Sequence, residues 1–193
     1  MDRDARGATI FSMDCTWLRR SLIAQAVLAV YFQAVVWFPL GSLNDQGGVN
    51  NRPLLEQIKA GRTTSGDFIF VLAFIMPVLL FLIGYLKRIR VLPWLCLAGY
   101  AVWLALQIQT WWSAYIFGAS ENWQRVYHRV FARTLKILPS FGNHLAPDAM
   151  HFLMQLLLVA VIVSGVIGLI GRGRAKTMKA GAVVKAGGGD VGQ

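Results

Sequence analysis

Residues 149–171 read AMHFLMQLLLVAVIVSGVIGLIG, a run without a single lysine, arginine, aspartate or glutamate. As a helix that rises about 1.5 Å per residue, this run is about 34 Å long, enough to cross a hydrocarbon core of about 30 Å. Three apolar segments of the same kind precede it, at 21–40, 68–86 and 91–118. The sequence therefore predicts an all-α integral membrane protein with four antiparallel transmembrane helices.

The composition agrees with a membrane protein. Hydrophobic residues make up 56% of the 193 residues and charged residues 15%, a balance typical of chains that live in lipid rather than water. The four segments and their connections form one transmembrane domain over 1–171, followed by a basic, glycine-rich tail at 172–193 that is predicted to be disordered. We attribute the net charge of +10 to residues flanking the membrane, and we expect no nucleic-acid partner.

Lysine and arginine concentrate on one side of the predicted membrane. Arg19 and Arg20 precede the first segment, the Lys87–Arg90 connection is short and basic, and more basic residues follow the fourth segment. Because positive charge in short loops stays in the cytoplasm, both termini are predicted to be cytoplasmic and the connections 41–67 and 119–148 to face outwards. The first segment is too long for a signal peptide, so we interpret it as a retained span. A bacterial inner membrane is the expected location.

Polar residues inside the predicted spans are all neutral. Amides in hydrocarbon need partners, so these side chains are expected to bond across helices, or alternatively to line a path for a solute. The fourth segment also carries small residues at Ser164, Gly165 and Gly168, which allow close approach of another helix, within the bundle or in another copy or protein. In the second segment, Pro77 predicts a kink. The amides are Gln25, Gln33, Gln107, Gln109 and Gln155.

The second outer connection contains an amphipathic pattern. Ser120 is a predicted N-cap, and Pro139 is expected to end the helix that follows. Apolar residues recur with helical spacing as far as Leu138, which predicts an interfacial helix that lies with its apolar face in the membrane. Its basic face is predicted to bind lipid headgroups or another anion. That face carries Arg125, Arg129, Arg133 and Lys136.

All three histidines of the chain belong to this connection and its junction with the fourth segment. His144, Asp148 and His151 follow one another closely, with His128 upstream. These four residues are candidate ligands of a divalent metal such as zinc, copper or iron. His144, Asp148 and His151 are alternatively candidates for acid/base catalysis, or for a structural role at the helix start. No haem is expected, because only His151 lies in a span.

Part of this region resembles the motifs of the type-2 phosphatidic acid phosphatase superfamily of membrane phosphatases. The likeness rests on Arg52–Pro53, on the run Pro-Ser-Phe-Gly-Asn-His at 139–144, and on His144 and Asp148 with three residues between them. The pattern departs from that family, because Asp45 stands at the place of a lysine, the Pro-Ser-Gly-His run is interrupted, and one histidine would serve two roles. The chain is therefore not assigned to the family.

Three functional hypotheses follow. The first is a non-enzymatic membrane protein that acts as a scaffold, accessory or regulatory subunit, with an outward-facing basic helix that engages lipid headgroups. The alternative is a lipid- or headgroup-directed enzyme that uses the His/Asp residues on the outer face. The second alternative is a small transporter or channel along the glutamine-bearing spans.

Overall fold

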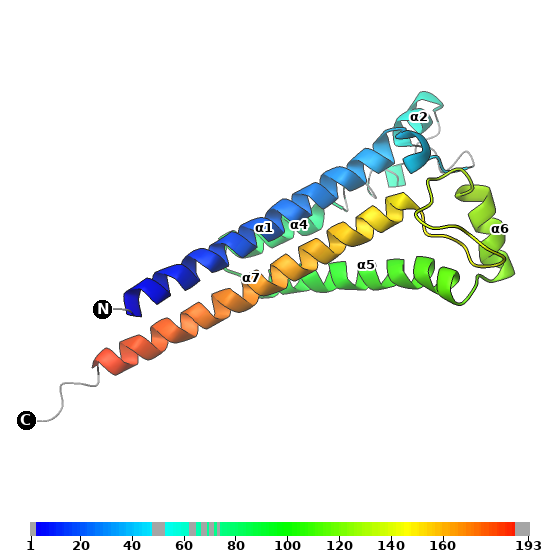
Figure 1. Ribbon diagram of the computed structural model, residues 1–193. Helices are drawn as coiled ribbons and strands as arrows, with labels where there is room; N and C mark the ends of the chain where they lie inside the picture. The colour runs from blue at the N-terminus through cyan, green and yellow to red at the C-terminus, as the bar shows by residue number, and fades with distance from the viewer. Residues whose placement is uncertain are drawn as a thin grey trace, which may run out of the picture.

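The structure of the chain is a computed structural model in which helices are joined by turns and two longer connections (Figure 1). No strand occurs in the part of the chain that it describes, although two isolated antiparallel bridges join residues of the second outer connection. The helices are α1 (Arg3–Trp37), η1 (Gly41–Leu43), α2 (Leu54–Lys59), α4 (Met76–Leu86), α5 (Val91–Ile116), α6 (Glu121–Val130) and α7 (Ala149–Gly187). The backbone is described for 3–47, 53–61, 65–66, 69, 72 and 74–187, and the side chains for those residues that fall within 16–171.

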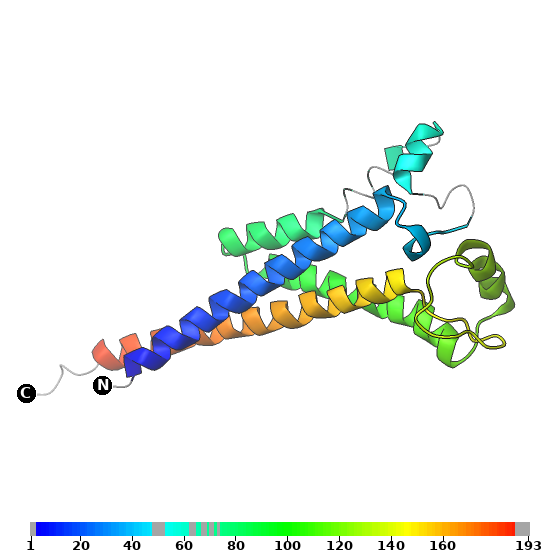
Figure 2. The ribbon, with the colours of Figure 1, turned by 45° about the horizontal axis from the view of Figure 1, so that its top comes forward.

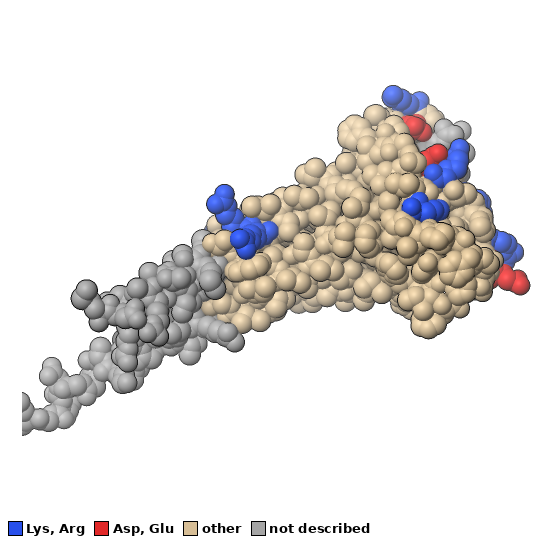
Figure 3. Space-filling view, in the orientation of Figure 1, with Lys and Arg blue, Asp and Glu red and all other residues tan. Residues whose placement is uncertain are grey.

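Three of these helices are long and apolar enough to cross a membrane: Thr16–Trp37 of α1, Val91–Ile116 of α5 and Ala149–Gly171 of α7. The start of α1 and the end of α7 lie at one end of the bundle, and α2 and α6 lie at the other (Figures 1 and 2). On the face in Figure 3, the charged side chains gather towards the two ends and leave the middle of the bundle bare. The chain is a small multi-pass membrane protein in contact with the lipid bilayer.

The second predicted span differs from the other three. Its described helix, α4, has 11 residues, about 16 Å at 1.5 Å per residue, which is half a hydrocarbon core. Pro77 stands in the first turn of α4 instead of kinking the middle of a longer helix. A proline fits there because the first turn does not need its missing N–H. Several residues of the predicted span between 67 and 73 lie outside the described part of the chain.

The small residues of α7 allow α1 and α5 to pack closely against it. A Cβ atom on Gly165 would lie 2.6 Å from Leu97 Cδ2 of α5, and one on Gly168 would lie 2.9 Å from the backbone nitrogen of Leu18 of α1. Ser164 beside them is buried. Of the two predicted uses of this surface, contact within the bundle is therefore the one observed. The helices of the same chain cover these residues, so they do not offer a surface to a second copy or another protein.

Two glutamines bond across helices as expected. Gln25 is fully buried and lies 3.5 Å from the Tyr100 hydroxyl of α5, and Gln155 of α7 accepts a hydrogen bond of 2.8 Å from the Trp112 indole of α5. Gln109, in contrast, is exposed on the outside of α5. Since that amide faces away from the bundle interior, the glutamines do not all lie along a single interior track.

The tail after the fourth span is helical where composition predicts disorder. α7 continues without a break to Gly187. Alanine, lysine and methionine, which all favour helix, make up most of residues 174–185, whereas the run of glycines begins only at Gly187. The described backbone of 172–187 is therefore helical, and the last six residues of the tail lie outside the described part.

The first outer connection is also anchored more firmly than its turn-rich sequence suggests. The Asn44 side chain is buried and donates to the carbonyls of Val35 (2.7 Å) and Phe38 (2.8 Å), and it accepts from the Leu40 N–H (2.8 Å). These bonds satisfy carbonyls that the end of α1 leaves without helical partners. Asn44 therefore ties the connection to the end of the bundle.

Candidate functional site

α6 covers the outer end of the bundle and begins as the sequence predicts. The Ser120 side chain accepts a hydrogen bond of 3.3 Å from the Trp123 N–H, which is the geometry of an N-cap. The apolar face of α6 turns towards the end of α5 and α7, where Tyr127 and Val130 are buried. This face therefore packs on protein, whereas the sequence predicts that it lies in the membrane interface.

α6 ends at Val130, eight residues earlier than the apolar pattern predicts. After it, Leu135 donates its N–H to the Ser42 carbonyl at 2.6 Å, and Ile137 donates to the Pro147 carbonyl at 3.2 Å. The chain from 135 to 137 thus runs antiparallel to the start of α7, with an isolated bridge between Lys136 and Asp148. These long-range backbone bonds replace the last predicted helical turns. The apolar spacing within one segment could not predict them, because their partners lie in other segments.

Trp111 is the centre of the contact between α6 and the bundle. It is 2% exposed and belongs to a buried cluster with Tyr127 and Leu145. Its ring lies edge-on to Phe131, with centroids 5.0 Å apart, and against the His151 ring at 4.3 Å. Aromatic pairs at these separations each contribute about 0.5 to 1.5 kcal/mol beyond the area that they bury. The apolar run 91–118, taken alone, gives no sign of this role of Trp111, because the partners lie in distant segments of the chain.

Asp148 and His151 form the closest ionisable pair in the described part of the chain. Asp148 Oδ1 accepts from the His151 backbone N–H at 2.8 Å and from His151 Nδ1 at 2.7 Å. Asp148 immediately precedes α7, so the first of these bonds caps the helix and the second fixes the orientation and tautomer of the imidazole. Asp148 is fully buried, and its Oδ2 has no hydrogen-bond partner among the described residues.

Lys136 reaches into the same buried region, although the sequence predicts it on the exposed basic face. Its ammonium lies 4.5 Å from the centroid of the Tyr127 ring and donates to Thr134 Oγ1 at 2.7 Å and to the Phe131 carbonyl. Burial lowers the pKa of Lys136 from its usual 10.5, and the nearby Asp148 carboxylate offsets part of that change. Lys136 thus bonds within the protein in this structure, because the chain turns inward after α6 ends.

Tyr127 connects α6 to the loop before α7. Its hydroxyl donates to the Ala146 carbonyl at 2.7 Å. Burial raises the pKa of Tyr127 above its usual 10.0, a hydrogen bond with Ser140 acts in the opposite direction, and Asp148 adds a smaller upward contribution. The hydroxyl therefore stays protonated at neutral pH and keeps donating this bond.

The other two histidines lie apart from the Asp148–His151 pair. His144 donates its Nδ1–H to the Tyr115 carbonyl at 2.7 Å and stacks on Phe141 with centroids 4.9 Å apart. His128 is exposed on α6. Across the described ranges, no three histidine, cysteine, aspartate or glutamate side chains come together as metal ligands. The four predicted ligands therefore do not converge on one site here.

Three arginines remain on the predicted basic face. Arg125 and Arg129 lie one turn apart on α6 and are exposed. Arg133, just past the end of the helix, lies with its Nε 3.6 Å from Asp45 Oδ2 of the first outer connection. An exposed pair of this kind contributes about 0 to 1 kcal/mol. Arg125 and Arg129 are thus the residues of this face that are open to an external anion.

The two outer connections also contact each other. Gly47 donates its N–H to the Val130 carbonyl at 2.6 Å, and a Cβ on Gly47 would lie 2.1 Å from the Arg129 carbonyl oxygen. Only glycine fits a backbone approach of this kind. We define the outer cap as residues 117–148 together with 41–47.

No known protein family, characterised protein or solved structure matches this chain.

Proposed function

We propose that the chain is a non-enzymatic scaffold, accessory or regulatory subunit of a bacterial inner membrane, with its outer cap engaging anionic lipid headgroups through Arg125 and Arg129. The observation that carries this proposal is the division of charge within the cap. Asp148 bonds His151 of α7 and Lys136 bonds inside the cap, whereas the two arginines are exposed one turn apart. Arginines at this spacing suit phosphate contacts.

The proposed topology has four crossings with both termini in the cytoplasm. α2 lies at the end of the bundle with α6, and α4 leads to the basic Lys87–Arg90 turn nearer the end with the termini (Figure 1). The chain between α2 and Leu86 must therefore pass from one side to the other, which supports a fourth crossing. The positive charges of that turn support a cytoplasmic position for it.

The headgroup contact can be tested with a reporter on α6. His128→Cys in a Cys15→Ser/Cys96→Ala background carries an environment-sensitive fluorophore, and the protein is reconstituted into phosphatidylcholine vesicles with or without phosphatidylglycerol. We expect a blue shift on phosphatidylglycerol that high salt reverses, because screening weakens exposed charge pairs.

Charge-removing variants complete this test. Arg125→Gln/Arg129→Gln should lose the shift, while Lys59→Gln on the exposed surface of α2 should keep it. The Lys59→Gln substitution removes a positive charge from the same end of the protein without changing α6. An equal response to both lipids in the parent protein, or an unchanged shift in the double variant, would contradict the proposal.

A second candidate function is a lipid-directed acid/base reaction at His151. The 2.7 Å bond from His151 Nδ1 to Asp148 favours it, since a carboxylate that orients an imidazole leaves Nε2 able to accept a proton. The test is to incubate vesicle phospholipid with the wild type or with His151→Gln and to analyse the lipid by mass spectrometry. The result decides between the enzyme and the scaffold. Lipid turnover that depends on His151 would favour the enzyme over the scaffold.

A further inference from the structure

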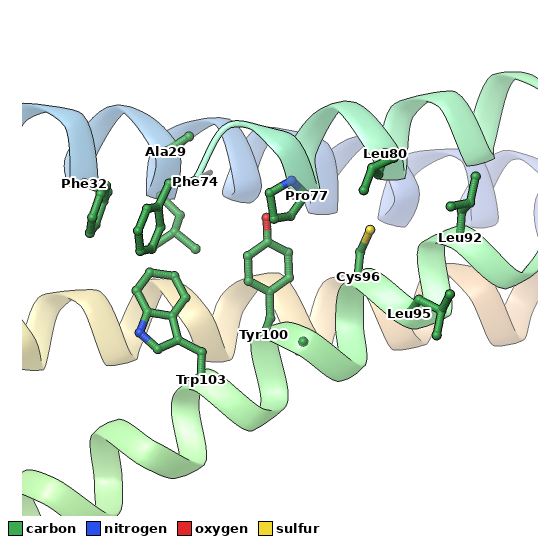
Figure 4. A pocket seen from close by; sticks show the side chains of 12 residues that line it. Ala29, Phe32, Phe74, Pro77, Leu80, Leu92, Leu95, Cys96, Tyr100 and Trp103 are labelled. Atoms are coloured by element: carbon green, nitrogen blue, oxygen red, sulfur yellow. The ribbon is translucent and has the colours of Figure 1, made fainter. Parts of the chain in front are cut away.

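A pocket of about 410 Å³ lies between α1, α4 and α5, away from the outer cap. One end is closed by aromatic rings: Phe32 and Phe74 stack with centroids 3.5 Å apart, and Trp103 lies 4.9 Å from Phe74. Figure 4 shows these rings together at one end, with the Tyr100 ring beside them. Pockets of about 300 to 1,000 Å³ with mostly apolar walls are the usual binding sites for small ligands.

The other end of the pocket is aliphatic and leads towards the basic turn. Leu80, Leu92 and Leu95 line it (Figure 4), and Leu92 follows Arg90 by two residues. Leu95 is 62% exposed, so this end opens to the surroundings of the helices. In a membrane-spanning bundle those surroundings are lipid chains.

The size and depth of the pocket match one leaflet of a bilayer. Its wall on α5 extends from Leu92 to Trp103, about 16 Å at 1.5 Å per residue, which is half of a hydrocarbon core of about 30 Å. Lys87, Arg88 and Arg90 are exposed immediately before the leucine end. A molecule with its apolar part in the pocket would therefore have its polar end beside three positive charges.

The wall offers little for recognition of a polar group. The polar side-chain atoms of its lining residues are the Cys96 thiol, the Tyr100 hydroxyl and the Trp103 indole N–H, and the hydroxyl lies 3.5 Å from the buried Gln25 Oε1. A ligand with carbonyl or charged groups along its length would lose hydrogen bonds on entering this site. A plain hydrocarbon chain would lose none.

We propose that this pocket binds an acyl chain of an anionic phospholipid from the leaflet on the Lys87–Arg90 side, with the lipid phosphate at Lys87 and Arg90. The apolar wall selects the chain, and the basic turn selects the headgroup. This site lies in the opposite half of the molecule from Arg125 and Arg129. The proposal for the pocket therefore does not depend on the function proposed for the outer cap.

Gly99 provides a direct way to fill the pocket. It lines the wall on α5, and a Cβ placed there would meet no atom within 4 Å. Gly99→Leu therefore adds bulk to the binding space from a Cβ position that meets no other atom, and it replaces a weak helix former by a strong one. Ala101→Leu is the matched control, since Ala101 is exposed on α5 and does not line the pocket.

The measurement is native mass spectrometry of protein in mild detergent, first as purified and then after delipidation and titration with phosphatidylglycerol or phosphatidylcholine of identical chains. We expect one phospholipid on the wild type and on Ala101→Leu, and binding at least about tenfold weaker in Gly99→Leu. Lys87→Gln/Arg90→Gln should still bind phosphatidylcholine but lose the preference for phosphatidylglycerol. Circular dichroism and size-exclusion elution check that each variant is folded.

Three results would overturn the proposal. Folded wild type could take up no phospholipid, Gly99→Leu could bind as tightly as Ala101→Leu, or the molecule retained from the membrane could be an isoprenoid or quinone. An undiminished phosphatidylglycerol preference in Lys87→Gln/Arg90→Gln would refute the assigned headgroup position. A negative result with the fluorophore on α6 would refute only the function proposed for the outer cap. It would not change the results expected for the pocket.

Discussion

Replacement of Gly168 by alanine should separate α1 from α7. The added Cβ would lie 2.9 Å from the backbone nitrogen of Leu18 and 2.9 Å from its Cγ atom. A side chain can rotate away from such a contact, but the backbone nitrogen moves only with the whole of α1. The helices must therefore move apart over the contact that they share, and overpacking of this kind costs about 1 to 3 kcal/mol.

The same substitution at Gly99 supplies the control. Alanine gains about 1 kcal/mol over glycine in either helix, but a Cβ on Gly99 meets no atom within 4 Å. The difference between Gly99→Ala and Gly168→Ala thus removes the propensity contribution and leaves the overpacking cost, about 1 to 3 kcal/mol. Gly165→Ala should lie between them, because the nearest atom there is a methyl group of the Leu97 side chain, at 2.6 Å.

The assay is reversible unfolding in mixed micelles of mild detergent and dodecyl sulfate, followed by circular dichroism and tryptophan fluorescence. We expect the midpoint of Gly168→Ala to fall well below that of Gly99→Ala, and that of Gly99→Ala to equal or exceed the wild type. If the two alanine variants were equally stable, the close approach of α1 to α7 would not exist in the folded protein.

Three other changes test the outer cap. Gly47→Ala, with its Cβ 2.1 Å from the Arg129 carbonyl oxygen, should release the first connection from α6. Weaker protection of the backbone amide at position 47 from hydrogen exchange would report this release, and unchanged protection would contradict it. Asp148→Ala removes the cap of α7 and the bond to His151 and should cost about 1 to 3 kcal/mol of unfolding free energy, whereas Asp148→Asn, which can still cap, should cost less. Burial lowers the pKa of Lys136 from 10.5 in the fold, so the unfolded state binds more protons at alkaline pH below 10.5. Stability should therefore rise with pH as 10.5 is approached, and Lys136→Met should abolish that slope.

The membrane class of the fold could be predicted because it depends on local composition alone. Uninterrupted apolar runs long enough for a bilayer are visible at 149–171 and 91–118 without any knowledge of their neighbours. The N-cap at Ser120 is equally local, since it needs only a hydroxyl before the first turn. The end of α6 could not be predicted in this way. The apolar spacing continues to Leu138, but backbone bonds to distant segments replace the helix after Val130.

The candidate site, too, could be predicted from the sequence only where it depends on local spacing. Proximity of Asp148 and His151 follows from a spacing of three residues at a helix start, so the sequence could suggest it. The inward position of Lys136 could not be read, because it depends on where α6 stops and on the Tyr127 ring beneath it. His144 is close to Asp148 in sequence, yet its ring bonds the Tyr115 carbonyl instead. Sequence distance within a loop does not determine which side a side chain faces.

The sequence by itself determined that this chain resides in a membrane, because transfer of long uncharged helices into hydrocarbon is favourable whatever they pack against. The tertiary structure decided what the individual residues do there. It placed Gly165 and Gly168 against α1 and α5, Lys136 inside the outer cap and an apolar pocket beside the basic turn. Each of these depends on contacts between segments far apart in the chain, and such contacts arise only from packing in three dimensions.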